Sequence, residues 1–144
     1  MFHDIQNQLM VKQTLTTAAA VSTDVYDLGK EGADISIGET YSALFVPTTA
    51  ATGGATYTLE VIQSSASAMS SPDVLATKAI AAGVLTVDTQ FILPIPQGAI
   101  SKRYLAFRVT PAGGTTPSVI LSAFLVPDKE IAVNKYFTKV YETI

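Results

Sequence analysis

The sequence contains no cysteine, no tryptophan and one histidine, His3. Without cysteine the chain has no disulfide framework, no thiolate-bound zinc or iron–sulfur site and no thiol nucleophile. A histidine this close to the first residue provides no imidazole in the body of the chain for a histidine-rich metal site or a Ser-His-Asp triad. We therefore expect a protein that is not an enzyme and that holds no cofactor and no metal.

Charge is also scarce. Charged residues make up 15% of the chain, against about 25% in an average soluble domain. The 9 basic and 12 acidic residues give a net charge of −3, which disfavours nucleic acid as a partner because such proteins normally carry a basic face. Serine, threonine and alanine replace the ions, and a hydroxyl costs much less to desolvate than a charge. This composition favours packed protein interfaces.

Long apolar runs are missing too. No uninterrupted run approaches the 18 residues of a membrane span, and five prolines break up the most apolar half of the chain. The first residues lack the cationic start and apolar stretch of a secretory signal. We expect no membrane partner and synthesis in a cytoplasm.

What is present is an alternation of apolar and polar residues, in a chain of 144 residues that corresponds to one domain. In residues 103–110, Leu105, Phe107 and Val109 share one face, and residues 56–63 alternate in the same way. Residues 41–47 precede the latter strand and predict a hairpin with it. Residues 119–126 are apolar on both faces apart from Ser122, so one of these faces needs cover from outside its own sheet.

Weaker strand patterns occupy residues 25–28, 35–37, 74–78, 84–87 and 91–95. A total of about eight short strands with turn signals between them favours an all-β, antiparallel sandwich or barrel. Pro94 and Pro96 cannot donate ladder hydrogen bonds, so residues 91–95 are expected at a sheet edge or bulge.

The two ends of the chain differ in composition from the middle. We predict an N-terminal arm over residues 1–13, a β-sandwich domain over residues 14–127, and a C-terminal arm or docking segment over residues 128–144. If extended at about 3.3 Å per residue, the last segment reaches about 55 Å, far enough to touch a neighbouring subunit. The alternative is a short amphipathic helix or closing strand docked on its own sandwich, and the sequence leaves both open.

Candidate chemical groups have simpler structural explanations. Hairpin turns account for the two glycine pairs, which lie in no phosphate-binding motif. A solvated strand end accounts for the acidic cluster better than a glycosidase pair or a calcium site does. A solubilising strand face accounts for the small basic patch better than an anion site. The residues concerned are Gly53, Gly54, Gly113 and Gly114 for the turns, Asp24, Asp27, Glu31 and Asp34 for the acidic cluster, and Lys102, Arg103 and Arg108 for the patch.

Four segments carry a resemblance to a known family. Residues 22–29 read STDVYDLG, and YTLEVIQSS (57–65), SSPDVLA (70–76) and KRYLAFRV (102–109) follow in the same order. They resemble the small capsid cement, or decoration, proteins of tailed bacteriophages, and the similarity spans about residues 14–127. The longer tail of this chain, residues 128–144, departs from that pattern and leaves the geometry of attachment open.

The resemblance implies a jelly-roll-like sandwich, to which the composition of the two ends adds extended N- and C-terminal arms. It also implies a small homo-oligomer, dimer or trimer, that binds the outside of a capsid and staples neighbouring major capsid subunits. Synthesis would then occur in the host cytoplasm and the final location would be the outer surface of the virion. The residues we expect at the capsid or subunit interface are Phe2, Lys135, Tyr136, Phe137, Lys139 and Tyr141, because aromatic side chains bury large areas at low entropic cost. Packing of the three tail aromatics on their own sandwich is the equal alternative.

Two other functions stay open. A carbohydrate- or receptor-binding sandwich of a phage tail or fibre is the main alternative, although the chain has no tryptophan to form an aromatic platform for a sugar. A hydrolase that uses the acidic cluster from Asp24 to Asp34 is a weaker one.

Overall fold

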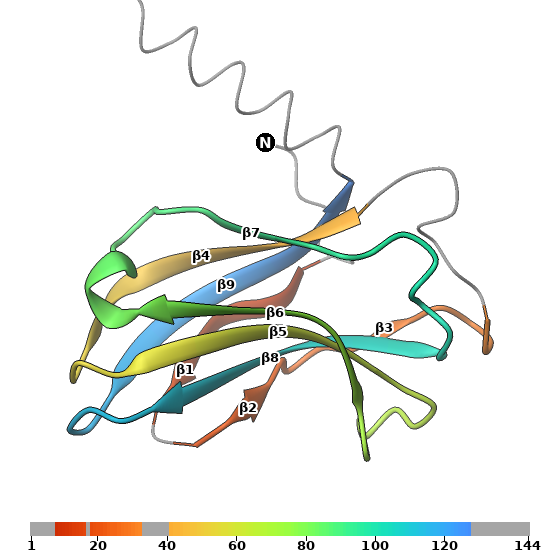
Figure 1. Cartoon of the computed structure of the whole chain (residues 1–144), viewed down its shortest axis with the longest axis horizontal. Helices are drawn as coiled ribbons and strands as arrows, with labels where there is room; N and C mark the ends of the chain where they lie inside the picture. The colour runs from red at the N-terminus through yellow and green to blue at the C-terminus, as the bar shows by residue number, and fades with distance from the viewer. Residues whose placement is uncertain (1–7, 17, 33–40, 128–144) are drawn as a thin grey trace, which may run out of the picture.

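The computed structural model describes residues 8–16, 18–32 and 41–127, which fold into two antiparallel sheets packed face to face (Figure 1). Sheet A has the strand order β1-β9-β4-β7. Sheet B has the order β2-β8-β5-β6, and β3 also pairs with β8. The elements are β1 Gln8–Leu15, β2 Ala20–Val21, β3 Tyr26–Asp27, β4 Tyr41–Thr52, β5 Thr56–Ser64, β6 Asp73–Ala81, the 3-10 helix η2 Ala82–Val84, β7 Phe91–Pro94, β8 Tyr104–Ala112 and β9 Ser118–Pro127.

This connectivity is that of a jelly roll, in which the chain keeps crossing from one sheet to the other. β1, β4, β7 and β9 form sheet A, and the strands between them in sequence form sheet B. The short strands β2 and β3 share the position beside β8, because they pair with different parts of it. The expected all-β, jelly-roll-like sandwich is confirmed.

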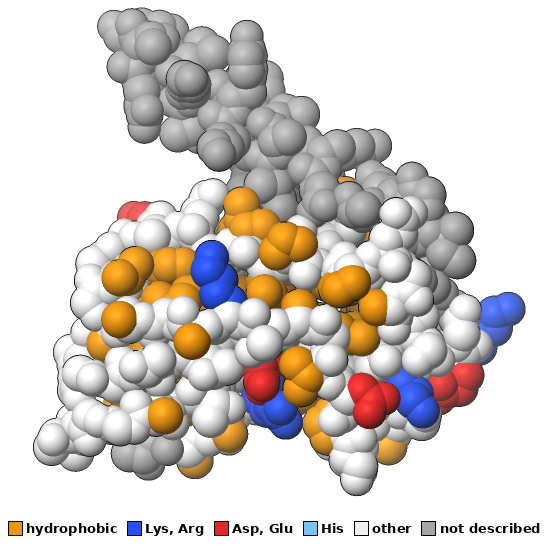
Figure 2. Space-filling model, in the orientation of Figure 1, with side chains coloured by type: hydrophobic (Ala, Val, Ile, Leu, Met, Phe, Trp, Pro, Cys, Tyr) orange, Lys and Arg blue, Asp and Glu red, His pale blue; other side chains and the backbone are white. Residues whose placement is uncertain are grey.

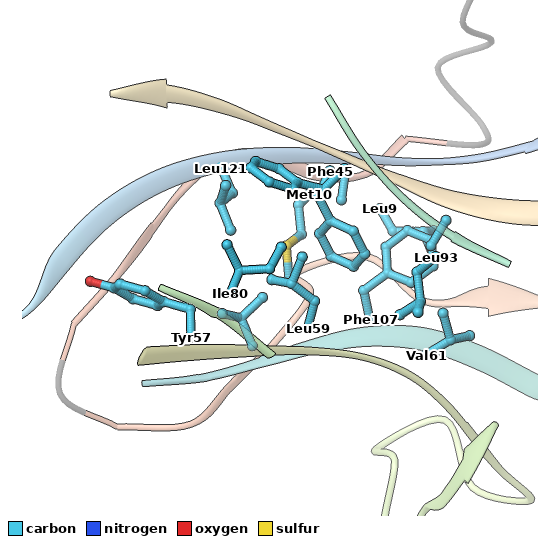
Figure 3. Close-up of a cluster of buried hydrophobic side chains, with 14 of the residues drawn as sticks. Leu9, Met10, Phe45, Tyr57, Leu59, Val61, Ile80, Leu93, Phe107 and Leu121 are labelled. Atoms are coloured by element: carbon cyan, nitrogen blue, oxygen red, sulfur yellow. The ribbon is translucent and has the colours of Figure 1, made fainter. Parts of the chain in front are cut away.

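The core lies between the two sheets and is built by alternate residues of each strand (Figure 3). Leu105, Phe107 and Val109 of β8 are at most 1% exposed, as their alternation predicts. The rings of Phe45 and Phe107 meet at a centroid distance of 5.3 Å and an interplanar angle of 55°. Because Phe45 belongs to sheet A and Phe107 to sheet B, this tilted aromatic contact ties the two layers together.

Among the described residues, Tyr57 is the largest fully buried side chain, and its hydroxyl has no hydrogen-bond partner among them. Burial raises the pKa of its phenol, so the group stays neutral. A buried hydroxyl without a partner has lost its bonds to water and gained none in return.

We therefore expect Tyr57→Phe to leave stability unchanged or to raise it by up to about 1 kcal/mol. Urea unfolding followed by far-UV circular dichroism measures this change. Tyr57→Leu, which removes ring volume from the same site, serves as the control and should cost about 2 kcal/mol or more. A clear loss of stability in Tyr57→Phe would mean that the hydroxyl is hydrogen-bonded in solution.

The predicted hairpin between residues 41–47 and 56–63 is wrong. β4 pairs with β7 and β9 in sheet A, whereas β5 pairs with β6 and β8 in sheet B. The turn at Gly53 and Gly54 therefore crosses between the sheets, and so does the turn at Gly113 and Gly114 between β8 and β9. All four glycines have positive φ angles, so they do form turns, but not hairpin turns.

The N-terminal boundary of the sandwich also differs from the prediction. Residues 8–13, assigned to an arm from the sequence, form most of β1, which pairs with β9 at the edge of sheet A. The strand escapes detection because bulges reset its alternation: Leu9 and Met10 are adjacent and both buried, and Lys12 has a φ of 45°. The rest of the predicted arms, residues 1–7 and 128–144, lies outside the described residues.

The weaker strand predictions have mixed outcomes. Residues 74–78 lie within β6, and residues 91–95 largely coincide with β7, which occupies a sheet edge as its prolines require. Residues 25–28 contribute only the two-residue β3. Residues 84–87 are not a strand, because η2 and a turn occupy them and only Leu85 is buried. Residues 35–37 lie outside the described part.

The edges of both sheets are protected against pairing with other strands. β1 and β6 each contain an irregularity in their pairing register and a lysine, Lys12 and Lys78. Lys78 lies opposite the buried Leu59, on the core side of β6. β7 ends in Pro94, and β2 and β3 have two residues each. Bulges, inward lysines, proline and short strands are the usual means of blocking edge-to-edge association, so contacts through the sheet faces are favoured.

Candidate functional site

All four segments that carry the family resemblance meet in sheet B. Residues 22–29 contain β3, residues 57–65 and 102–109 contain most of β5 and β8, and residues 70–76 contain the first part of β6. Segments that are separated by up to about eighty residues in the sequence are therefore hydrogen-bonded neighbours in one sheet. We take this sheet as the candidate functional site.

Ser22 hydrogen-bonds the first of the four segments, residues 22–29, to the last, residues 102–109. Its Oγ donates to the carbonyl of Asp24 at 2.8 Å and accepts from the backbone N–H of Phe107 at 3.2 Å. Its own N–H donates to the carbonyl of Phe107 at 2.7 Å. A buried serine thus satisfies backbone groups on both sides of the gap between β2 and β3.

Asp27 and Arg103 form a bidentate ion pair, with Nε to Oδ1 at 2.8 Å and Nη2 to Oδ2 at 3.0 Å. The N–H of Gly29, which has a φ of 91°, also donates to Oδ1 at 2.8 Å. The hydrogen bond from Arg103, followed by that from Gly29, lowers the pKa of Asp27. The guanidinium also lies 5.1 Å from the centroid of the Tyr104 ring. The Asp27-Leu28-Gly29 segment therefore forms a turn closed by the aspartate side chain, and this side chain also binds Arg103, the residue before β8.

This ion pair predicts a local sensitivity to acid. Because the pKa of Asp27 is lower in the folded than in the unfolded chain, the pair stabilises the fold above the unfolded value of 3.8, and this contribution is lost as the pH falls through the folded pKa. We expect Asp27→Asn to lose less stability than the parent protein between pH 7 and pH 3. Thermal unfolding at both pH values measures this, and equal losses in the two proteins would contradict the assignment.

Gln63, at the end of β5, also joins two segments of sheet B by side-chain hydrogen bonds to the backbone. Its Oε1 accepts from the backbone N–H groups of Ser101 and Lys102 at 2.9 and 3.1 Å, and its Nε2 donates to the Ser101 hydroxyl at 3.3 Å. The side chain is 4% exposed. It fixes the loop that leads into β8, and nearby Ser64 Oγ donates to the carbonyl of Ser70 at 2.8 Å.

The outer side of this sheet, away from the core, carries a nearly uncharged surface. Glu60 and Arg108 lie opposite each other on β5 and β8 and form an ion pair at 2.6 Å, with side chains 14% and 27% exposed. Their neighbours on the same side are small or weakly polar. We call this surface the sheet B outer face; it comprises Val21, Thr56, Thr58, Glu60, Thr77, Ala79, Arg108 and Thr110.

Two ion pairs lie on sheet B, Glu60–Arg108 and Asp27–Arg103, and Figure 2 shows acidic and basic side chains next to each other in its lower part, with a further basic side chain apart from them above. At the other end of the sheet, Ile62, Met69 and Ala106 form a small buried cluster with Val25 and Tyr104 beside it. The loop that contains Met69 therefore folds back over β5 and β8 and limits the open part of the sheet. Among the described residues of the sheet B outer face, the two charged side chains, Glu60 and Arg108, are paired with each other.

The sequence-predicted site residues have these positions. Asp24 and Glu31 are exposed, Asp27 is held by Arg103, and Asp34 lies outside the described residues. Arg103 and Arg108 are both paired with carboxylates. In the described ranges no three His, Cys, Asp or Glu residues gather as metal ligands. His3 and the expected interface residues, Phe2, Lys135, Tyr136, Phe137, Lys139 and Tyr141, lie outside those ranges, so their roles stay predictions.

The same ranges contain no helix with the length and apolar character to cross a membrane.

The model of the Bbp16 family matches residues 10–125 of the chain. The chain belongs to the Bbp16 family. The matched range begins within β1 and ends within β9, so the family region of this Bbp16 member extends from the first strand of the sandwich to the last. No curated protein sequence matches the chain.

Among solved structures, PirA is similar with a TM-score of 0.46 and 11% identity, over 79% of this chain and 92% of PirA. A Clostridium thermocellum endo-1,4-beta-D-xylanase 10B, solved as CBM22-1-GH10 modules with xylohexaose, is similar with a TM-score of 0.33 and 14% identity. That match covers 82% of this chain and 25% of the xylanase chain. Neither likeness bears on what the Bbp16 member binds.

Proposed function

We propose that this Bbp16 member is a virion structural protein that binds the outside of a phage capsid, staples neighbouring major capsid subunits and so stabilises the shell. The observation that carries the proposal is the assembly of the four cement-like segments into one sheet whose outer face is nearly charge-neutral. Its partners would be the major capsid protein and further copies of itself, as a dimer or trimer. It would be made in the host cytoplasm and end on the outer capsid surface.

The physics of the sheet B outer face suits such a contact. Threonine and alanine lose little on leaving water. Glu60 and Arg108 already neutralise each other at 2.6 Å, so docking a partner does not leave either charge unpaired. The blocked edges of the sheets favour this face over strand addition.

An oligomer would bind the capsid more strongly than a single copy does. Each copy adds a modest contact, and linking copies in an oligomer makes the second and third contacts effectively intramolecular. Because the bound protein stabilises only the closed lattice, mass action shifts the shell away from its separated subunits.

The test mixes purified protein with capsid shells that lack it. We expect co-sedimentation and a raised temperature of shell disruption. The double variant Ala79→Glu/Thr110→Glu adds two carboxylates to the sheet B outer face and should bind at least tenfold more weakly, which corresponds to about 1.4 kcal/mol. Thr49→Glu, at an exposed threonine of β4 in sheet A, is the matched control and should bind normally.

Absence of co-sedimentation by the parent protein would overturn the proposal. If Thr49→Glu weakened capsid binding as much as the double variant does, the sheet B outer face would not be the binding surface. Binding on a glycan array without affinity for shells would favour the carbohydrate-binding alternative instead.

A further inference from the structure

Arg108, on the sheet B outer face, uses only part of its guanidinium group within the described chain. Its Nε donates to Glu60 Oε2 at 2.6 Å. No described residue pairs with Nη1 or Nη2, although these two nitrogens carry most of the N–H donors of an arginine. The side chain is 27% exposed, and the only buried side-chain atom without a partner among the described residues is the Tyr57 hydroxyl. Water therefore reaches Nη1 and Nη2 in the free protein.

Arg103 binds its carboxylate in a different way. Two of its nitrogens, Nε and Nη2, donate to the two carboxylate oxygens of Asp27, which is the geometry in which an arginine–carboxylate pair is strongest. Glu60 meets Arg108 through one oxygen and one nitrogen only. The ion pair on the sheet B outer face is therefore balanced in charge but leaves hydrogen-bond donors of Arg108 for another acceptor.

Short side chains surround this pair on the outer side of the sheet. Thr58 and Thr110 lie opposite each other on β5 and β8, two residues along from Glu60 and Arg108, and Thr77 of β6 lies opposite Glu60. None of these three carries a charge, and none of them hydrogen-bonds to the guanidinium. A partner surface can therefore approach Arg108 closely.

Docking on this face removes water from Nη1 and Nη2. Donors that lose water and gain no acceptor are costly, and more so when they belong to a charged group. An apolar partner surface would leave the free N–H groups of Arg108 in that state. A partner carboxylate would accept from them, but it would place a second negative charge beside Glu60, on a face that has one cation among its described residues. Neutral acceptors satisfy the donors and keep the charges of the face balanced.

We infer that the part of the major capsid protein that docks on the sheet B outer face presents backbone carbonyl oxygens to Nη1 and Nη2 of Arg108. Carbonyl groups inside helices and sheets are already paired, so these oxygens belong to a loop or an extended arm of the partner. The hydroxyls of Thr58, Thr77 and Thr110 can donate to or accept from the same stretch of backbone. The inference rests on the proposed function and adds to it the chemistry of the partner segment.

The first test changes the donors of residue 108 and keeps its charge. Arg108→Lys retains a cation for Glu60 but not the planar set of donors, and we expect it to bind capsid shells about tenfold more weakly than the parent protein in co-sedimentation. Arg103→Lys is the matched control. It makes the same change in the pair with Asp27, which is not part of the sheet B outer face, so its affinity for shells should stay within about threefold of the parent value. Urea unfolding followed by far-UV circular dichroism shows that both variants are folded.

The second test gives opposite results for a neutral and for a negative partner. Glu60→Gln keeps the shape of the side chain and leaves the charge of Arg108 unbalanced. Against carbonyl groups the unbalanced charge has to be desolvated on docking, so we expect binding to shells to weaken about threefold or more. Against a carboxylate the same substitution removes a repulsion, so binding would become tighter.

A third test separates a polar from an apolar partner. The double variant Glu60→Leu/Arg108→Met replaces the ion pair by apolar side chains of similar volume, a change that folded proteins tolerate well. Carbonyl groups of the partner would lose their donors and stay unpaired in the complex, so we expect binding to shells to weaken about tenfold or more. An apolar partner surface would bind this variant more tightly than the parent protein.

Each other result overturns the inference. Parent-like binding by Arg108→Lys would mean that the partner does not use Nη1 and Nη2. Tighter binding by Glu60→Gln would assign a carboxylate to the partner, and tighter binding by the double variant would assign an apolar surface. Weaker self-association of Arg108→Lys in size-exclusion chromatography, with shell binding unchanged, would mean that a second copy occupies the face. All of these results require a parent protein that binds shells, whereas its failure to bind them would overturn the proposed function itself and this inference with it.

Discussion

Gly114→Ala is expected to be the most destabilising single substitution of an exposed residue, at about 4 kcal/mol or more. Gly114 has a φ of 73°, and a Cβ at this position would lie 2.2 Å from the carbonyl oxygen of Gly53 and 2.7 Å from the backbone nitrogen of Ala55. Backbone atoms cannot give way as a flexible side chain can. The two turns that cross between the sheets touch here, since Thr115 N–H also donates to the Gly53 carbonyl at 2.8 Å.

The neighbouring glycine supplies a matched control. Gly113 has a φ of 74°, and a Cβ there would meet nothing within 4 Å. Gly113→Ala therefore carries the same backbone strain, about 1–2 kcal/mol, without the collision. Guanidinium unfolding followed by far-UV circular dichroism gives both values. Similar losses in the two variants would mean that the turns move apart in solution and that the close contact is not needed for the fold.

The contrast between these glycines shows the limit of reading a turn from sequence. Gly53-Gly54 and Gly113-Gly114 are correctly predicted as turns because glycine reaches positive φ at low cost. Their partners are not predictable locally, because each turn crosses between sheets and its tight contact is with the other turn. The wrong hairpin between β4 and β5 has the same origin. Adjacent strands in a sequence usually pair, and a jelly roll is a fold in which several do not.

Alternation predicts strands well where the pleat is regular. β5 and β8 alternate over most of their length and pair with each other over nine residues without a shift, and both are found from the sequence. β1 is missed because its bulges place Leu9 and Met10 on the buried side in succession. A bulge is a property of two paired strands, so the pattern of one strand does not reveal it.

In the candidate site too, the residue types can be predicted from the sequence, but the contacts between them cannot. The four segments, the acidic cluster and the basic patch are visible as residue types, and the sequence favours a structural explanation for Asp27 and Arg103 without indicating that they pair. Their pairing with each other, and that of Glu60 with Arg108, joins residues 76 and 48 positions apart. Strand register decides such contacts, and register depends on the whole sheet.

Gln63 is the clearest residue that sequence reasoning does not find, and Gln63→Leu is expected to cost about 2–4 kcal/mol. The substitution keeps the volume but removes the acceptor of two backbone N–H groups, those of Ser101 and Lys102. Donors left without a partner away from water cost about 1–3 kcal/mol each. The loop before β8 should loosen as a result, and amide hydrogen exchange at residues 101 and 102 should speed up together with the loss of stability in urea.

Gln13 is a control of matched chemistry in a different environment. It also bridges backbone groups, donating to the carbonyl of Val21 at 2.9 Å and accepting from the N–H of Thr23 at 3.0 Å, but both bonds are exposed. Water replaces the lost partners in Gln13→Leu, so the cost should stay below about 1 kcal/mol. Burial, and not the number of hydrogen bonds, then accounts for the difference between the two glutamines. Equal costs would mean that water reaches Ser101 and Lys102 as easily as it reaches Thr23, and that this end of sheet B is open in solution.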